Sequence, residues 1–289
     1  NGGKLLKRII YIFRFYRLAW KLRREYDIVF VHMNQEYILL GGIFWMMMGK
    51  KIFMWRNHYS GSFLTDIAAS MCDKVFCTSK FSYTAKYKKT VIMPVGVDVD
   101  SCRMDEPVAR LPKSILFLGR LDESKRPHVL IDALGLLFSQ GIKFSATFAG
   151  GPSKEASDYP NKLLAQVESL KISDRVKFVG AVPNTETFRY YRSHDIFVNC
   201  SKSGMLDKTI FKASACGCLV LVTILDFADL VGQRFIFPEN DSAALSEKLA
   251  EFLAISAEER ALLTSQLSGF IKNHGLPILV ERLARTMGQ

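Results

Sequence analysis

The sequence predicts an α/β protein made of two Rossmann-like domains, each with a doubly wound parallel sheet between layers of helices. Three observations support this fold class. Short apolar runs rich in β-branched and aromatic residues alternate with segments of helical periodicity along the chain. The length of 289 residues corresponds to roughly two domains. The composition, with 49% hydrophobic and 23% charged residues, is that of a folded protein and excludes a disordered chain.

Four strands are expected in the first part of the chain. The predicted strands are 27–33, 51–55, 74–78 and 91–94, and the predicted helices are 4–24, 37–49, 64–71 and 81–87. The stretch 99–113 contains Pro107, Pro112 and mixed charges without periodicity, which indicates a linker. We therefore expect a first domain over residues 1–108.

The alternation resumes at residue 114 and predicts a second domain over residues 109–273. Its predicted strands are 114–119, 144–149, 176–179, 196–199, 219–223 and 235–237, and its predicted helices are 127–140, 159–170, 185–193, 208–215 and 242–254. These strands are almost entirely apolar, which is typical of a parallel sheet covered on both faces. The tail from 257 is helical with a break at Gly275-Leu276-Pro277, and this break leaves a C-terminal helix over 274–289. Folds of this kind bind ligands at the carboxyl ends of the strands, which here would face the cleft between the domains.

Positive charge is concentrated in the first part of the chain. Residues 1–100 carry a net charge of +9, whereas residues 101–289 carry +2. In the segment 4–24 basic residues form one helical stripe beside an apolar stripe that includes Leu5, Ile9 and Tyr16. Such a helix can lie on an anionic membrane surface, or it can be a packed helix whose basic side is solvated. No nucleic-acid-binding signature accompanies the charge, so we expect no nucleic-acid partner.

Several classes of protein are excluded by the pattern of particular residue types. The longest apolar run, 37–48, is too short to cross a bilayer and is interrupted by two glycines. The six cysteines have neither the density of a disulfide scaffold nor the spacing of a zinc site, so we expect reduced thiols in a cytoplasmic protein. The five histidines are scattered, and no two have a metal-ligand spacing. We therefore expect no metal.

The loop at the start of the second domain combines a glycine with two cations. The strand ends at Gly119, and Arg120 and Lys125 follow five residues apart. The planar guanidinium of Arg120 and the point charge of Lys125 can surround one diphosphate, although two exposed cations of an ordinary loop have the same spacing. Further on, a helix is expected to begin beside Gly204 and Asp207. Its free N–H groups form a second possible anion site, and Asp207 can cap it.

Five segments, taken in order, carry a resemblance to a known family. They are the loop from Gly119 to Lys125, the turn Ala149-Gly150-Gly151-Pro152, the strand Val176-Lys177-Phe178-Val179-Gly180, the strand after His194-Asp195, and the helix end Lys212-Ala213-Ser214-Ala215-Cys216-Gly217. As a set they resemble the family 4 glycosyltransferases of the GT-B fold, the glycosyl transferases group 1. The resemblance covers most of residues 27–255 and is strongest from 114 to 223.

The resemblance implies a retaining, metal-independent transferase without a cofactor. It would move a sugar from a nucleotide-diphosphate sugar to a lipid-linked or polysaccharide acceptor at the inner face of the membrane. Arg120 and Lys125, next to Gly119, would hold the diphosphate and neutralise the leaving group, and the backbone near Val182 would meet the base. The sugar and phosphate would meet the backbone amides of Gly204, Met205, Leu206, Asp207 and Lys208. His58 occupies the place of a family histidine near the donor sugar, with a loop histidine without a ligand as the alternative, and the C-terminal helix would cross back to the first domain.

The sequence departs from the family pattern at two places. Gly204 and Lys212 stand where the family has two glutamates eight positions apart, and a lysine cannot accept hydrogen bonds from ribose hydroxyls. The family's first domain opens with a glycine-rich strand–helix unit that this sequence lacks, so we expect the first domain to be incomplete. A non-catalytic relative that binds a nucleotide or a protein partner is therefore the alternative hypothesis. A nucleotide-sugar epimerase is a third, for which the sequence offers no residue set.

Overall fold

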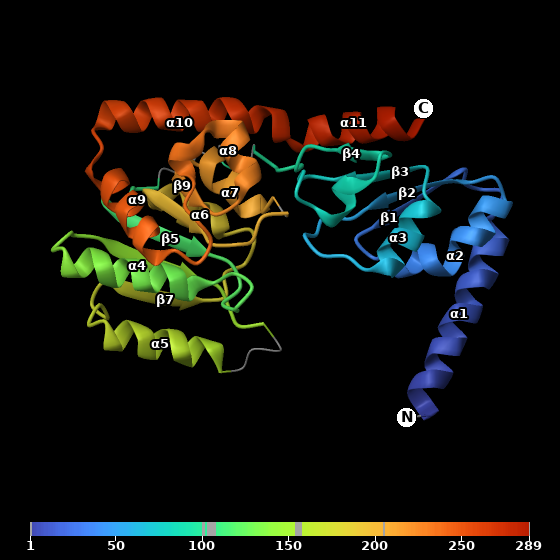
Figure 1. The fold of residues 1–289 in the computed structure, drawn as a ribbon, viewed down its shortest axis with the longest axis horizontal. Helices are drawn as coiled ribbons and strands as arrows, with labels where there is room; N and C mark the ends of the chain where they lie inside the picture. The colour runs from blue at the N-terminus through green and yellow to red at the C-terminus, as the bar shows by residue number, and fades with distance from the viewer. Residues whose placement is uncertain (1, 100–101, 103–107, 154–157, 205, 289) are drawn as a thin grey trace. The chain divides into compact units, whose positions relative to one another are not determined.

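The computed structural model describes residues 2–99, 102, 108–153, 158–204 and 206–288. The chain forms two compact units, one made of residues 1–93 and 282–289 and the other of residues 94–281. Each unit is an α/β fold around one parallel sheet (Figure 1), as the sequence predicts. The sequence predicts domain boundaries after residues 108 and 273, whereas the compact units divide after residues 93 and 281. The predicted domain boundaries therefore stay predictions.

The first unit contains a four-stranded parallel sheet. Its strands are β1 (Ile28–His32), β2 (Lys51–Trp55), β3 (Lys74–Cys77) and β4 (Thr90–Ile92), in the order β1-β2-β3-β4. Alternate residues of β2 face opposite sides of this sheet. Ile52 and Met54 join the core formed with helices α2 (Glu36–Met47) and α3 (Phe63–Ser70), while Phe53 stacks on Phe76 with ring centroids 5.8 Å apart. The strand order runs in one direction, as in one half of a doubly wound sheet.

Helix α1 (Gly2–Leu22) is attached to this unit near its C-terminal end. Phe15 packs on Trp45 and Trp20 on Phe44 of α2, with ring centroids 5.7 and 6.3 Å apart. Ala19 is the one residue of α1 that is buried among its described side chains, residues 6–22. The preceding turns of α1 extend beyond α2 (Figure 1).

The second unit contains a five-stranded parallel sheet with a reversal in strand order. Its strands are β5 (Ser114–Leu118), β6 (Ser145–Ala149), β7 (Val176–Gly180), β8 (Ile196–Asn199) and β9 (Leu219–Val222), in the order β7-β6-β5-β8-β9. The chain first builds outward from β5 to β7 and then returns to add β8 on the other side of β5. This is the doubly wound arrangement that the sequence predicts.

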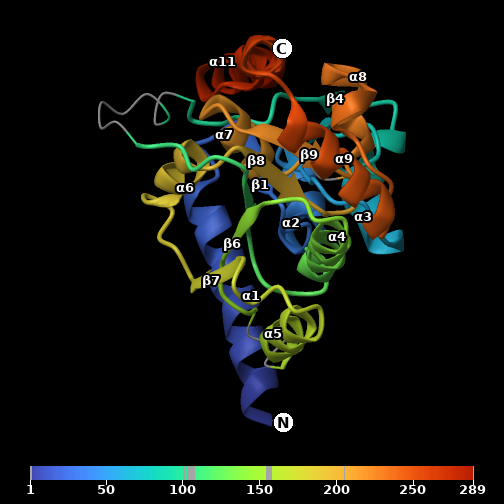
Figure 2. The same ribbon diagram turned by 90° about the vertical axis from the view of Figure 1, so that its left-hand side faces the viewer.

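Helices cover both faces of the second sheet. Its helices are α4 (Pro127–Ser139), α5 (Tyr159–Ser169), α6 (Thr187–Ser193), α7 (Lys208–Ala215), α8 (Leu225–Val231), α9 (Ser242–Ala254) and α10 (Ala257–Ile271). Helix α4 packs with α5 and α9 on one side of the sheet, while α7 packs with α6 and α10 on the other (Figure 2). The last helix, α11 (Leu276–Gly288), contributes residues to both units.

Two predicted elements are wrong, and one helix was not expected. The predicted strand 235–237 is a 3₁₀ turn, η3 (Gln233–Phe235), followed by one bridge between Ile236 and Val222, because Pro238 has no N–H to continue a ladder. The predicted helix 81–87 is a single 3₁₀ turn, η1 (Tyr83–Lys86). Helix α8 forms over residues for which no helix was predicted. The predicted linker 99–113 lies partly outside the described residues.

The six cysteines are free, buried thiols. Cys216 donates to Cys102, and their sulfur atoms lie 2.7 Å apart. Burial raises the pKa of Cys200 and of Cys218 to about 12, so both stay protonated at neutral pH. Within the described part of the chain, no helix combines the length and the apolar character needed to cross a bilayer.

Candidate functional site

The reversal of strand order places the candidate site between β5 and β8. In a doubly wound sheet the loops after these two strands diverge and leave a crevice at their carboxyl ends. The loop 119–126 follows β5, and the segment 200–207 follows β8. Both segments contain residues predicted from the sequence, including Arg120, Lys125 and Asp207. The topology therefore brings the two predicted anion-binding segments to one edge of the sheet.

A close approach of two backbones fixes the start of the β5–α4 loop. The N–H of Gly119 donates to the carbonyl oxygen of Ala149 at 3.0 Å. Gly150 has a φ of 154°, and a Cβ at this residue would lie 1.7 Å from the carbonyl oxygen of Gly119. Only glycine fits at position 150, which gives a physical reason for the turn that follows Ala149.

Asp122 organises the rest of this loop from a buried position. Its side chain is 7% exposed and accepts hydrogen bonds from the N–H of Lys125 at 3.2 Å and from the hydroxyl of Ser124 at 2.5 Å. Its other oxygen lies 3.4 Å from the guanidinium of Arg120. The side chain of Arg120 is 63% exposed, so it has room to contact a ligand.

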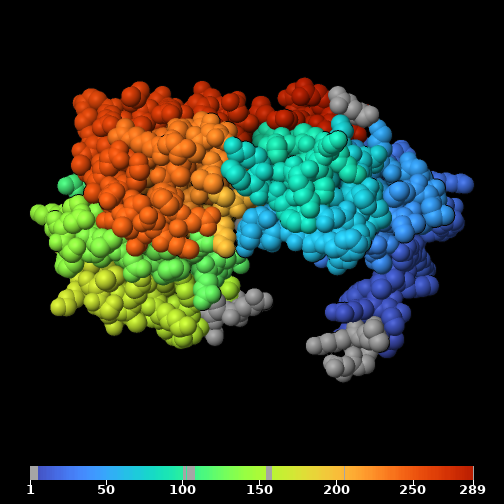
Figure 3. Space-filling model, viewed as in Figure 1, coloured from blue at the N-terminus to red at the C-terminus, as the bar shows by residue number. Residues whose placement is uncertain are grey.

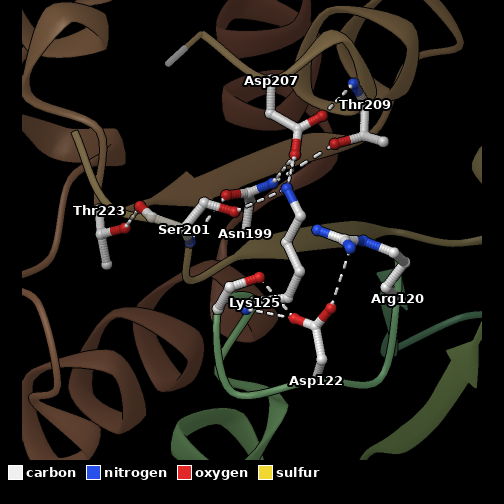
Figure 4. A network of polar contacts seen from close by, with 9 residues as sticks. Arg120, Asp122, Lys125, Asn199, Ser201, Asp207, Thr209 and Thr223 are labelled. Carbon is white, nitrogen blue, oxygen red and sulfur yellow. Dashed lines mark hydrogen bonds and ion pairs between the residues drawn. The ribbon is translucent and has the colours of Figure 1, made fainter. Parts of the chain in front are cut away.

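Lys125 connects the two loops (Figure 4). Its ammonium lies 2.5 Å from Oδ2 of Asp207 and 3.2 Å from the hydroxyl of Ser201. Asn199, the last residue of β8, donates to the same carboxylate oxygen at 3.3 Å. An ammonium has three N–H donors, and these contacts use two of them. Among the residues that the structure describes, Lys125 therefore keeps one donor that a ligand could use.

Asp207 caps helix α7, as the sequence predicts. Its Oδ1 accepts a hydrogen bond from the N–H of Thr209 at 3.1 Å, while Oδ2 pairs with Lys125. Burial acts to raise the pKa of this carboxyl, but the charge and hydrogen bond of Lys125 and the bonds from Thr209 outweigh burial and hold the pKa below 3.8. Asp207 is thus ionised at neutral pH.

A second polar connection runs beside this network. Arg126, which is 7% exposed, donates to Glu239 at 2.9 Å, and the N–H of Ser203 donates to the other oxygen of Glu239 at 3.2 Å. The hydroxyl of Ser203 donates to the carbonyl oxygen of Thr223 at 3.3 Å. The β5–α4 loop and the β8–α7 segment are therefore joined at two places.

The other predicted donor-side residues lie around this network. Gly204 is buried with a φ of 96°, Leu206 is buried, and Val182 is half-buried against the core. Lys208 is exposed, and its ammonium donates to the carbonyl oxygen of Gly96 at 3.2 Å. Met205 lies outside the described residues.

Lys212 reaches the loop between β7 and α6. Its ammonium donates to the side-chain oxygen of Asn184 at 2.9 Å and lies 5.2 Å from the ring centroid of Phe188. Lys212 thus binds the loop that contains Val182. A glutamate at position 212 would instead present hydrogen-bond acceptors.

His58 belongs to the first unit, in the loop after β2. Its Nδ1 accepts from the N–H of Ser60 at 3.0 Å and lies 2.8 Å from the Ser60 hydroxyl. Its ring stacks on Tyr59 with centroids 4.5 Å apart. These contacts fix the orientation of the imidazole.

The residues of the network that were not assigned a role from the sequence include Asp122, Asn199, Ser201 and Glu239. Asn199 and Ser201 carried only a partial signal, because they lie at the carboxyl end of a buried strand. Glu239 carried none, since it lies 113 positions from its partner Arg126 in the chain. Within the described ranges, no group of three or more His, Cys, Asp or Glu residues could hold a metal ion.

The fold and the second unit each resemble known proteins. Two Rossmann-like units with parallel sheets form the GT-B fold of glycosyltransferases. Residues 112–254, which lie in the second unit, match the family model described as Glycosyl transferases group 1.

Curated relatives and solved structures show the same resemblance. The chain is 29% identical to the D-inositol 3-phosphate glycosyltransferase of Frankia alni over 47% of this chain and 36% of that protein. It is 27% identical to the putative colanic acid biosynthesis glycosyltransferase WcaL of Escherichia coli over 68% of this chain and 48% of that protein. The chain thus spans less than half the length of both relatives. The crystal structure of Anabaena HepE in complex with UDP is 19% identical with a TM-score of 0.83, covering 94% of this chain and 81% of that chain, which shows the shared fold.

Proposed function

We propose that this chain is a glycosyltransferase that moves a sugar from a nucleotide-diphosphate sugar to an acceptor hydroxyl. The convergence of Lys125 and the start of α7 in one polar network carries the proposal, because it places an ammonium with a remaining donor beside a helix N-terminus at the switch point of the second sheet. The family domain over residues 112–254 supports the same function. A fold shared with a UDP complex favours a nucleotide sugar as the donor.

In this proposal Arg120 and Lys125 stabilise the departing nucleoside diphosphate. When the bond between the sugar and the diphosphate breaks, the leaving group takes the electron pair and gains negative charge. A cation held in place before the reaction stabilises that charge without reorganisation. Asp207 and Ser201 hold Lys125 in place, and the exposed guanidinium of Arg120 can form two parallel bonds to phosphate oxygens.

The finer features of the reaction are also part of the proposal. The transfer is retaining and needs no metal, since the two cations neutralise the leaving group. The base lies near Val182, and the amides around Gly204 and Asp207 meet the sugar and phosphate. His58 acts next to the donor sugar. The acceptor is a lipid-linked saccharide or a polysaccharide at the inner face of the membrane, and the name of the relative WcaL, which refers to colanic acid biosynthesis, favours such an acceptor.

A second candidate function is binding without catalysis. Lys212 stands where the resembling family has a glutamate, and its ammonium is bound to Asn184 and lies beside Phe188. A lysine at this place offers the ribose hydroxyls no acceptor, so the donor could bind in another way or without turnover.

Sugar release from labelled nucleotide sugars tests the proposed function. Purified protein is incubated with UDP-, GDP- and ADP-linked sugars and a lipid extract, and free nucleotide and labelled product are measured. We expect turnover with one donor and at least a ~10-fold loss in Arg120→Ala, which removes a charged contact to the leaving group. Lys143→Ala is the matched control, because Lys143 is exposed on the loop before β6.

Two outcomes would contradict the proposal. Full turnover in the Arg120→Ala, Lys125→Ala double variant would place the diphosphate elsewhere. Nucleotide binding by calorimetry without turnover of any donor, in the presence of the acceptor extract, would support the non-catalytic alternative.

A further inference from the structure

Arg126, the residue after Lys125, has a backbone conformation that favours glycine. Its φ is 50° and its ψ is 46°, in the left-handed region, where a side chain crowds its own backbone. It also lies at the N-cap position of α4, where Ser, Thr, Asp, Asn or Gly is preferred. Strained conformations of this kind persist only where the surrounding structure holds the residue, and they cluster at functional sites. The conformation therefore indicates that the side chain of Arg126 has a role that glycine could not fill.

The guanidinium of Arg126 forms a partly buried ion pair with Glu239. Its Nη1 lies 2.9 Å from Oε2 of Glu239, and the two side chains are 8% and 35% exposed. Glu239 lies in a tight turn, in which the N–H of Asp241 donates to the carbonyl oxygen of Pro238 at 3.3 Å. Asp241 then caps α9 by accepting from the N–H of Ala244 at 2.8 Å. Helices α4 and α9 pack against each other, as the green and orange segments in Figure 3 show, so both ends of the ion pair are held by the beginnings of packed helices.

Glu239 also holds the segment that follows β8. Its Oε1 accepts a hydrogen bond from the N–H of Ser203 at 3.2 Å. The hydroxyl of Ser203 in turn donates to the carbonyl oxygen of Thr223 at 3.3 Å and accepts from the N–H of Leu225 at 2.9 Å. One carboxylate therefore connects the end of the β5–α4 loop with the segment 200–204, and that segment is tied to the start of α8.

This connection joins the same two segments as the contacts of Lys125 do. Lys125 binds Ser201 and Asp207, and in the proposed reaction its ammonium must also contact the diphosphate. A diphosphate competes with Asp207 for that ammonium, because both are anions next to one cation. When Lys125 turns toward the ligand, its contacts to the second segment weaken, whereas the guanidinium of Arg126 stays buried against Glu239.

We propose that Arg126 and Glu239 are positioning residues that keep the β5–α4 loop and the segment 200–204 at a fixed spacing while Lys125 binds the diphosphate. The inference rests on the proposed sugar transfer and names two residues that act in it without touching the substrate. Loops that are already held in their bound arrangement lose less conformational freedom when the donor binds. Arg126 therefore acts on the affinity for the donor, whereas Lys125 acts on the charge of the leaving group.

Two substitutions of Arg126 separate this role from a purely structural one. Arg126→Gly and Arg126→Ala both remove the ion pair, but only glycine relieves the left-handed strain. We expect both to raise the KM for the donor ~10-fold with kcat changed less than ~3-fold, although Arg126→Gly should have the higher urea midpoint of the two. Lys125→Ala should instead lower kcat at least ~10-fold. Steady-state kinetics with the nucleotide sugar and urea unfolding measure these values.

Substitution of Glu239 tests whether the two residues act as one unit. Glu239→Ala should raise the KM as Arg126→Gly does, and the double variant should exceed the larger single effect by less than ~2-fold, because each change removes the same connection. Arg234→Ala is the matched control. Arg234 pairs with Glu251 at 2.7 Å and with Glu259 at 2.6 Å, near the C-terminal end of α9. This control should lower the urea midpoint and leave the KM unchanged.

Hydrogen exchange gives a readout that needs no donor. The amides of the segment 200–204 should exchange faster in Arg126→Gly and in Glu239→Ala than in wild type, because the N–H of Ser203 loses a fixed acceptor. Arg234→Ala should exchange as wild type does. Unchanged exchange in this segment, an unchanged KM, or a KM that follows the urea midpoint across these variants would overturn the inference. Faster exchange in a protein that turns over no donor would support the positioning of the loops and count against the proposed function alone.

Discussion

At the scale of single residues, the central feature is the ion pair that joins the two loops of the site. Lys125 and Asp207 are each less than a fifth exposed, with side-chain exposures of 18% and 17%, and they lie 2.5 Å apart. Removing one partner of such a pair leaves the other charge partly buried and unpaired. Arg120, by contrast, is exposed and pairs weakly with Asp122. The two cations should therefore differ in their effect on stability.

We predict that Asp207→Asn lowers the free energy of unfolding by about 2 kcal/mol at pH 7, because Lys125 loses its partner. Arg120→Ala should change it by less than about 0.5 kcal/mol, since the side chain of Arg120 is 63% exposed and Asp122 keeps its hydrogen bonds from Ser124 and Lys125. Urea unfolding of both variants at pH 7 measures the difference. The pKa of Asp207 lies below 3.8 in the folded state, so its contribution is present above pH 3.8 and is lost as pH falls through the native pKa. An equal stability for the two variants would contradict this assignment.

At the scale of elements, the start of the β5–α4 loop contacts the turn after β6. This contact fixes the position of the backbone from which the side chain of Arg120 extends. Gly150→Ala would place a Cβ 1.7 Å from the carbonyl oxygen of Gly119, and neither backbone can give way without displacing a strand end. We expect a loss of at least ~2 kcal/mol in stability and a weaker affinity for nucleoside diphosphates. Thermal unfolding and calorimetry measure the two effects.

Gly269→Ala is the control for this prediction. Gly269 lies within α10, and a Cβ there would meet no atom within 4 Å. Alanine should stabilise that helix by ~0.5–1 kcal/mol. If Gly150→Ala behaved as Gly269→Ala does, the close backbone approach would not exist in solution.

Most elements could be predicted from the sequence because their patterns are local. The bounds of β2, β8, α7 and α9 match the predicted ranges residue for residue. The strand predicted over 235–237 failed because Phe235 and Phe237 are buried by the second unit as a whole and not by a ladder of hydrogen bonds. The predicted helix 81–87 is a short run whose composition could not distinguish a 3₁₀ turn from an α-helix.

The candidate site could be predicted only in part. Arg120, Lys125 and Asp207 have local signals, namely cations in a loop after a strand and an acidic residue before a helix. The roles of Asn199, Ser201 and Glu239 depend on the strand order β6-β5-β8-β9, which places distant segments side by side. No local pattern encodes that order, so these residues could not be assigned from one sequence.

At the scale of the whole molecule, buried histidines make stability depend on pH. Burial lowers the pKa of His274 to about 4. Its Nδ1 accepts a hydrogen bond from the N–H of Val95 at 3.3 Å, and its ring lies beside the ring of Phe270. Burial also lowers the pKa of His194 and of His128. The unfolded chain binds protons at these groups near pH 6.5, whereas the folded chain stays neutral to lower pH.

We predict that stability falls as pH drops from 6.5 toward 4, because the unfolded state then binds more protons than the folded state. His274→Gln should flatten this dependence, since glutamine keeps an acceptor for Val95 but does not titrate. The midpoint of urea unfolding, measured at half-unit pH steps for wild type and for His274→Gln, would show the difference in pH dependence. A wild-type midpoint that stays constant over this range would contradict the burial of neutral histidines.

The central proposal is that Arg120 and Lys125, at the carboxyl edge of the sheet between β5 and β8, hold a nucleoside diphosphate. Titration calorimetry with UDP, GDP and ADP, on wild type, Arg120→Ala and the control Lys143→Ala, tests it most directly. The account predicts that one of these nucleotides binds wild type and Lys143→Ala alike, and binds Arg120→Ala at least ~10-fold more weakly while that variant keeps wild-type stability. Equal affinity of Arg120→Ala and wild type, or no binding of any of the three nucleotides, would contradict it.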